Sequence, residues 1–175
     1  MSVNRGLYQL WKKYLYQHSV DHENGAGLIL AAGKGTLSAM CCFLGVPSVN
    51  VHVRNVAGQT ILHLAAQQHD GFYIMMMLLR DSRMDIYATD TVGRTLLSYA
   101  ASNDDCRPLS VLLRHNDIDV NMAGVQGKTP FSYAVNRGHK KAVKKLLDDT
   151  RLDPNLTSDH LSPIAIAAGS GSWSF

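Results

Sequence analysis

The segment GLILAAGKGT, from Gly27 to Thr36, contains residue types that bind phosphate. Gly33 and Gly35 flank Lys34, and glycine-rich loops bring backbone N–H groups close to the phosphates of a nucleotide. That chemistry requires a buried strand that leads into the loop. If Ala31–Ala32 instead lies in a helix, the same residues carry no chemistry, so the rest of the chain has to decide.

Other reactive side chains lack partners at a useful spacing. The Cys41–Cys42 pair has no nearby positive charge in the sequence to activate a thiolate. No paired base accompanies Ser98 or Ser132, which leaves nucleophilic catalysis unsupported. His18 and His22 are four residues apart and would share one helix face, but no third ligand group completes a metal site. We therefore predict no enzyme activity, no catalytic residue, no metal and no cofactor.

The chain repeats with a period of about 34 residues. Three segments align: GQTILHLAAQQ from Gly58, GRTLLSYAASN from Gly93 and GKTPFSYAVNR from Gly127. Each is followed by a second apolar stretch that ends in a Leu pair and by a turn that contains Asp. Counting back 34 residues from Ala65–Ala66 gives Ala31–Ala32. The opening segment therefore takes the place of a first helix in a divergent repeat.

This period divides the chain into six parts. We predict an N-terminal capping helix (1–23), a divergent repeat 1 (24–57), repeat 2 (58–92), repeat 3 (93–126), repeat 4 (127–159) and a partial repeat 5 (160–175). The first part could instead be a helix that docks a partner. Because the last part stops after one helix, without a polar outer face, we expect it to be truncated from a longer array.

These segments resemble the ankyrin repeat, whose pattern is Gly-x-Thr-Pro-Leu-His-x-Ala-Ala, a short turn, a second helix and a hairpin. The resemblance covers about residues 24–168. It implies an all-α fold, an ankyrin-type α-solenoid of helix-turn-helix repeats joined by short β-hairpin turns. Departures are Ile61 and Leu96 in place of Pro, and Ser98 and Ser132 in place of the His retained at His63. The GRTLLSYAA and GKTPFSYAV form resembles arrays common in fungal multidomain proteins.

An enzyme remains one alternative, because GLILAAGKGT also resembles the signature that opens sugar nucleotidyltransferases. That signature has an Arg after its Gly-Thr, where this chain has Leu37. The repeats also leave no room for the sheet of that enzyme. Nucleotide binding would favour this interpretation over the repeat array.

The resemblance implies that the protein binds a partner protein on a concave surface of hairpin tips and first helices. In ankyrin-like arrays the contacting positions lie before and after the turn glycine and just after the Ala pair. On this chain the predicted partner-binding residues are Val56, Gln59, Gln67, Gln68, Thr91, Arg94, Ser102, Asn103, Val125, Lys128, Asn136 and Arg137. They become more basic towards the C-terminus, which suits a partner that is acidic at one end.

A basic patch follows at Lys140, Lys141, Lys144 and Lys145, which the i, i+4 spacing places on the outer face of a helix. It is either a solvated face or a site for an acidic partner or a phosphate-rich surface. A mild net charge of +3 does not indicate nucleic acid, and no apolar run is long enough for a membrane span.

Three cysteines and no secretory signal indicate a reducing compartment, the cytoplasm or the nucleus. We expect a monomeric protein-binding module. The other interpretation is an architectural segment of a longer array or of a receptor-type multidomain protein.

Overall fold

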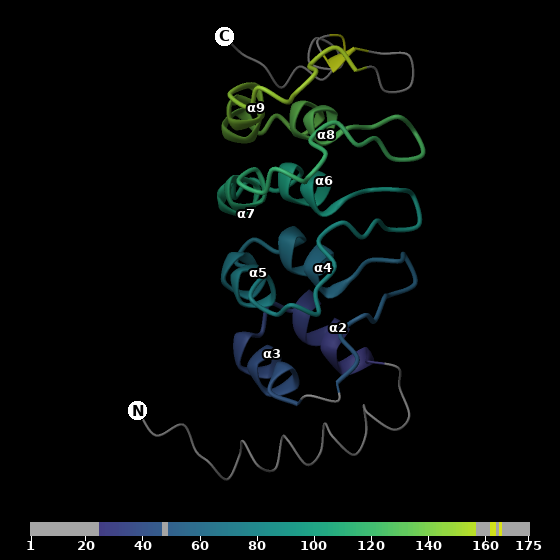
Figure 1. Ribbon diagram of the computed structural model, residues 1–175, viewed down its shortest axis with the longest axis vertical. Coiled ribbons are helices and arrows are strands. Elements are labelled where there is room, and N and C mark those ends of the chain that lie inside the picture. Colours follow the sequence, from purple (N-terminus) through teal and green to yellow (C-terminus); the bar gives the residue numbers. More distant parts are fainter. Residues whose placement is uncertain (1–24, 47–48, 157–161, 164, 166–175) are drawn as a thin grey trace.

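The computed structural model describes residues 25–46, 49–156, 162, 163 and 165. This part of the chain forms four helix pairs stacked in one direction (Figure 1). The pairs are α2 (Ala26–Gly33) with α3 (Leu37–Leu44), α4 (Ile61–Gln67) with α5 (Phe72–Leu78), α6 (Leu96–Ala101) with α7 (Arg107–Leu112), and α8 (Pro130–Asn136) with α9 (Lys140–Leu147). The predicted capping helix at 1–23 and most of the partial repeat at 160–175 lie outside the described residues.

The helices form two layers, with the first helix of each pair in one and the second helix in the other (Figure 1). Small side chains let the first helices pack closely, and Ala31–Ala32, Ala65–Ala66, Ala100–Ala101 and Ala134 are all buried. Larger side chains from the second helices fill the space between the layers: Met40, Ile74, Leu78, Leu109, Leu112 and Leu146. Since the apolar face of each pair is covered by its neighbours, the stability of the stack comes mainly from contacts between repeats.

A threonine caps the first helix of three repeats. Thr60 accepts a hydrogen bond from the backbone N–H of His63, and Thr95 and Thr129 accept the equivalent bonds from Ser98 and Ser132. Each bond satisfies an N–H group that the helix itself leaves free. In repeat 1 the corresponding place is taken by Gly25, which has no side chain to cap α2.

Short hairpins connect the repeats, and they confirm the predicted β-hairpin turns. Antiparallel bridges join Arg54 to Thr60 and Thr89 to Thr95. Gly93 has a φ of 75°, in the left-handed region that glycine adopts without strain. Neighbouring hairpin tips are joined through the backbone: Thr91 N donates to Ala57 O at 3.1 Å, and Val125 N donates to Val92 O at 2.8 Å. These bonds fix the distance between one repeat and the next.

The segment Gly27–Thr36 is a helix and a turn. Gly27 to Gly33 belong to α2, in which Ala31–Ala32 is buried as Ala65–Ala66 is in α4. The nucleotidyltransferase interpretation requires a buried strand at this point, and that expectation is wrong. The repeat period assigned the segment correctly.

Arg151 joins the last two repeats on the second-helix side. Its Nη2 donates to Asp149 at 2.7 Å. Both of its terminal nitrogens also donate to backbone carbonyls at the end of the preceding repeat: Leu113, His115, Asn116 and Ile118. Arg83 makes the matching contacts two joints earlier, between repeats 1 and 2, with Asp81 and with the Val49 carbonyl. Asp117 stands at the corresponding position of repeat 3.

Replacing Arg151 by alanine should lower the free energy of unfolding by about 1–3 kcal/mol, because several carbonyl groups lose a charged donor. Urea denaturation followed by circular dichroism measures the change. Arg114→Ala is the control, since Arg114 is exposed just after α7. Equal losses in the two variants would show that Arg151 does not fasten the joint.

Gly71 tests how tightly the turn between α4 and α5 is packed. A Cβ added at Gly71 would lie 1.8 Å from the carbonyl oxygen of Ala65, so the backbone would have to move. We expect Gly71→Ala to cost about 2 kcal/mol in thermal or urea denaturation. Gly33→Ala is the control, because a Cβ at this last residue of α2 meets nothing within 4 Å. Its effect should be neutral or stabilising, and a Gly71→Ala protein as stable as the wild type would contradict the packing argument.

Candidate functional site

The hairpins and the first helices make one continuous surface. Figure 1 shows the hairpins projecting from the same side of the stack, beyond α4, α6 and α8. We call this surface the groove face and define it as hairpins 54–60, 89–95 and 124–129 together with these three helices and the two residues that follow each of them. The second helices lie on the opposite side.

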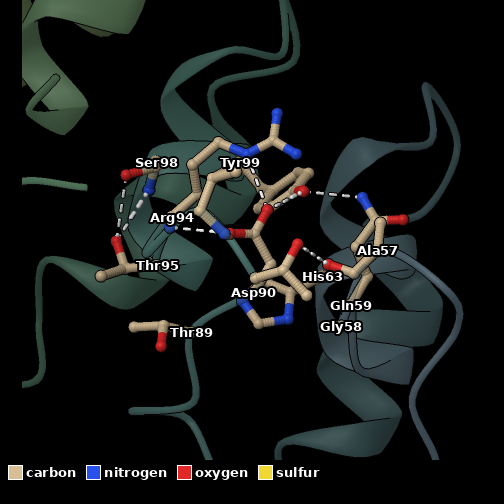
Figure 2. A network of polar contacts seen from close by, with 12 residues as sticks. Ala57, Gly58, Gln59, His63, Thr89, Asp90, Arg94, Thr95, Ser98 and Tyr99 are labelled. Atoms are coloured by element: carbon tan, nitrogen blue, oxygen red, sulfur yellow. Dashed lines mark hydrogen bonds and ion pairs between the residues drawn. The ribbon is translucent and has the colours of Figure 1, made fainter. Parts of the chain in front are cut away.

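Asp90 is at the centre of the groove face, and its side chain is completely buried. One carboxylate oxygen accepts the backbone N–H groups of Val92 and Arg94, at 3.0 and 2.9 Å. The other accepts Arg94 Nε and the Tyr99 hydroxyl, both at 2.7 Å (Figure 2). Burial alone would raise the pKa of Asp90, but these four hydrogen bonds outweigh it and the pKa lies below its usual value. The carboxylate is therefore charged and fully paired.

The same network crosses from repeat 3 to repeat 2. Gln59 Nε2 donates to the Tyr99 hydroxyl at 2.7 Å, and Asn55 Nδ2 donates to Gln59 Oε1 at 2.6 Å. Burial, with the hydrogen bond to Asp90, raises the pKa of Tyr99 to about 12, so its hydroxyl keeps the proton that it donates. A chain of hydrogen bonds therefore holds the two hairpins in a fixed relation to each other.

Arg94 is the member of this network that reaches the surface. Its guanidinium lies 4.7 Å from the centre of the Tyr99 ring, and a third of its side chain is exposed. Nε is occupied by Asp90, while the terminal nitrogens point away from that carboxylate (Figure 2). Among the described residues, those terminal nitrogens make no hydrogen bond. Asp90 and Tyr99 thus hold the Arg94 cation in position, and its terminal nitrogens remain available as hydrogen-bond donors on the groove face.

His63 has a structural role in the first helix of repeat 2. Its Nδ1 accepts the backbone N–H of Thr60 at 3.1 Å, so the side chain bonds the backbone inside its own repeat. The side chain is only 1% exposed, and burial lowers its pKa to about 4. The negative charge of Asp90 opposes part of this fall in the pKa. The ring is therefore neutral at physiological pH.

Comparison with known proteins decides the family. A family model described as "Ankyrin repeats (3 copies)" matches residues 28–122 and again residues 69–159. The chain belongs to the ankyrin-repeat family. Ankyrin repeats generally serve as protein–protein interaction modules, and the all-helical repeat solenoid is the fold expected of them. No curated protein matches the chain.

The ankyrin array places the predicted partner-binding residues at different depths. The exposed ones are Val56, Gln67, Thr91, Val125, Asn136 and Arg137, the half-buried ones are Gln68, Arg94, Ser102 and Lys128, and the buried ones are Gln59 and Asn103. Ten of the twelve therefore have surface that a partner could reach.

The prediction of Gln59 and Asn103 as surface residues is wrong. Gln59 is used by the network with Tyr99. Asn103 Nδ2 donates to the backbone carbonyls of Ala66 and Gln68, at 2.9 and 3.0 Å, and so satisfies groups at the end of α4. At both positions an amide side chain turns into the space between ankyrin repeats, because buried polar groups there need a partner.

Asp90 and Tyr99 were not predicted as part of the site. A signal was present in the sequence, since Tyr99 and Tyr133 occupy the same place in the first helices of two repeats. A large polar aromatic side chain beside the small residues of this layer requires a hydrogen-bond partner when buried. Asp90 is that partner for Tyr99, and Gly124 replaces it one repeat later.

The lysines of α9 form a separate surface. Lys140, Lys141 and Lys144 are exposed and Lys145 is half-buried. Because α9 belongs to the layer of second helices, this basic patch lies away from the groove face (Figure 1).

In the part of the chain that the structure describes, no group of three or more His, Cys, Asp or Glu side chains could hold a metal ion. Within the same residues, no helix is long and apolar enough to cross a membrane.

Proposed function

We propose that this ankyrin array binds a partner protein on its groove face and has no catalytic role. The observation that carries the proposal is the backbone pairing of successive hairpin tips, Thr91 with Ala57 and Val125 with Val92. This pairing holds exposed side chains at set distances along the groove face. A surface that is already ordered loses little conformational entropy when a partner binds.

The charge of the groove face favours an acidic partner. Arg94, Lys128 and Arg137 follow one another along the repeats, whereas repeat 2 has the neutral Gln59 and Gln68 at the positions of Arg94 and Arg137. Opposite charges across an interface raise the association rate and exclude wrong partners. We propose a monomer that acts in the cytoplasm or the nucleus, and the three free cysteines support a reducing compartment.

Affinity capture from a matched cell extract tests the groove face. The test protein carries Val125→Glu and Arg137→Glu, two groove-face positions whose side chains are exposed. The control carries Lys144→Glu and Leu147→Glu on α9, which are also exposed and change the charge equally. Arg94 is left unchanged, because a glutamate beside the buried Asp90 would unfold the hairpin.

We expect a protein that is captured by the wild type and by the α9 control to be lost from the groove-face variant. Loss from the α9 control alone would place binding on the lysine patch and contradict the proposal. If neither variant nor wild type captures a protein, the architectural role in a longer array becomes the better explanation. Circular dichroism of each variant confirms that its helices are intact.

A further inference from the structure

We propose that Arg94 is the anchor of the groove face and that it binds a side-chain carboxylate from an acidic segment of the partner. The inference rests on the function proposed above and adds to it the chemistry of the central contact. A guanidinium binds a carboxylate best end-on, through two parallel N–H···O bonds from its terminal nitrogens. Those are the nitrogens that Arg94 leaves without a hydrogen bond among the described residues.

The side chain of Arg94 is held in position before any ligand arrives. Asp90 accepts its Nε at 2.7 Å, and the Tyr99 ring lies beneath the guanidinium at 4.7 Å. Asp90 is itself fixed by Tyr99 and by two backbone N–H groups, and Tyr99 is fixed by Gln59. An arginine on the surface normally loses rotamer freedom when it binds a ligand. Here most of that loss has already occurred on folding.

Repeat 3 differs from its neighbours at this position. Gln59 takes the place of Arg94 in repeat 2 and is buried, and Lys128 takes it in repeat 4. The place of Asp90 is taken by Asn55 and by Gly124. Gly124 supplies no carboxylate at that place, and the ammonium group of Lys128 bonds the exposed Gln126 at 2.9 Å. At this position of the repeat the groove face therefore has a fixed guanidinium in repeat 3 and a single ammonium group in repeat 4.

A carboxylate suits the site better than a phosphate does. The buried Asp90 carboxylate lies directly behind the guanidinium and offsets its charge, and it repels a dianion more strongly than a monoanion. Lys128 and Arg137 then attract further acidic residues of the same segment at longer range. An acidic peptide, which presents one negative charge per side chain, matches this pattern.

Binding of a short oligo-glutamate peptide with blocked ends to the whole chain tests the inference. Fluorescence anisotropy measures its affinity, and an oligo-glutamine peptide of the same length is the control ligand. NMR follows the Arg94 Nε–H signal, which reports the site in the wild-type protein. Arg94→Gln removes the cation, Arg94→Lys keeps the charge but loses the fork, and Arg114→Gln is the matched control on an exposed arginine after α7.

We expect oligo-glutamate to bind and to shift the Arg94 Nε–H signal, and both Arg94 variants to bind at least about tenfold more weakly than the Arg114→Gln control. An unshifted signal, equal affinity of the Arg94→Lys variant, or no binding by the wild type would each overturn the inference. So would tighter binding of inorganic phosphate or of single-stranded DNA, which would show a phosphate site.

Failure of this inference can be distinguished from failure of the proposed function. If oligo-glutamate shifts only the backbone signals of Lys128 and Arg137, the groove face still binds and only the anchor is wrong. If it shifts only the signals of α9, the lysine patch binds acidic ligands and Arg94 does not. The capture experiment leaves Arg94 unchanged and uses no oligo-glutamate, so it judges the groove face independently.

Discussion

Acidification from pH 6.5 to pH 4 should remove about 3 kcal/mol of stability through His63 alone. Burial lowers the pKa of this ring from its ordinary value of 6.5 in the unfolded chain to about 4 in the folded protein. Between these two values the unfolded chain takes up a proton that the folded chain does not, so the unfolded state is favoured. The contribution is complete above pH 6.5 and is lost as the pH falls through the folded pKa. Urea denaturation at several pH values measures it.

The chain itself supplies the control substitution. Ser98 and Ser132 stand at the position of His63 in the next two repeats, and each still receives the cap bond to its threonine. In His63→Ser the fall in stability between pH 6.5 and pH 4 should therefore be smaller by about 3 kcal/mol, whatever the variant costs at neutral pH. Identical pH profiles for the two proteins would rule out a neutral buried imidazole.

Carboxyl groups contribute equally in both proteins. The pKa values of Asp81, Asp90, Asp105 and Asp149 lie below their usual value of 3.8. Their contribution to stability is complete well above pH 3.8 and begins to be lost as the pH approaches that value. Because the wild type and His63→Ser lose this contribution alike, the difference between their profiles reports on His63.

Removing the carboxylate of Asp90 should be the most damaging change on the groove face. Asp90→Ala leaves the Tyr99 hydroxyl, Arg94 Nε and two backbone N–H groups without their acceptor. Breaking a buried charged pair in this way costs about 3–5 kcal/mol. Chemical denaturation at neutral pH measures the loss, which includes the bond that joins repeat 3 to repeat 2 through Tyr99.

Asp90→Asn distinguishes the loss of the hydrogen bonds within the turn from the loss of the negative charge that faces Arg94. Asn55 occupies the same position one repeat earlier, and its oxygen accepts the backbone N–H groups of the turn. An asparagine at position 90 should keep those turn bonds, while its amide nitrogen faces the Arg94 donor. We expect a loss of about 2 kcal/mol.

Asp119→Ala is the control for both Asp90 variants. Asp119 is exposed and accepts one backbone N–H, from Asn121. Its loss should cost less than about 1 kcal/mol. If Asp90→Ala costs no more than this control, the buried network does not stabilise the stack.

The fold could be predicted from the sequence because each repeat is specified by patterns among residues that are close together in the chain. The threonine caps, the Ala pairs and the turn glycines each depend on a few neighbouring residues, and their recurrence located every described helix pair. Even repeat 1, which lacks the threonine cap, was assigned by its distance from Ala65–Ala66. The family match then agreed with the prediction.

The candidate site was harder to predict, because its contacts cross between repeats. Position in the repeat marked Gln59 and Asn103 as surface residues, yet both reach 35 or more residues along the chain to bond Tyr99 and the end of α4. Whether a polar side chain points to solvent or into the stack depends on which hydrogen-bonding group of the neighbouring repeat would otherwise lack a partner. One repeat, taken alone, does not contain that information.

The arginine contacts on the second-helix side have a mechanical consequence. Arg83 and Arg151 fasten the joints between repeats 1 and 2 and between repeats 3 and 4, whereas Asp117 stands at this position in repeat 3. The joint between repeats 2 and 3 is held on the groove face by Gln59 and Tyr99. On the second-helix side the guanidinium of Arg107 lies 4.8 Å from the centre of the Phe72 ring, which belongs to the preceding repeat. Because this joint is held on both sides, the array should resist bending there, and the spacing of the groove around Arg94 should change little.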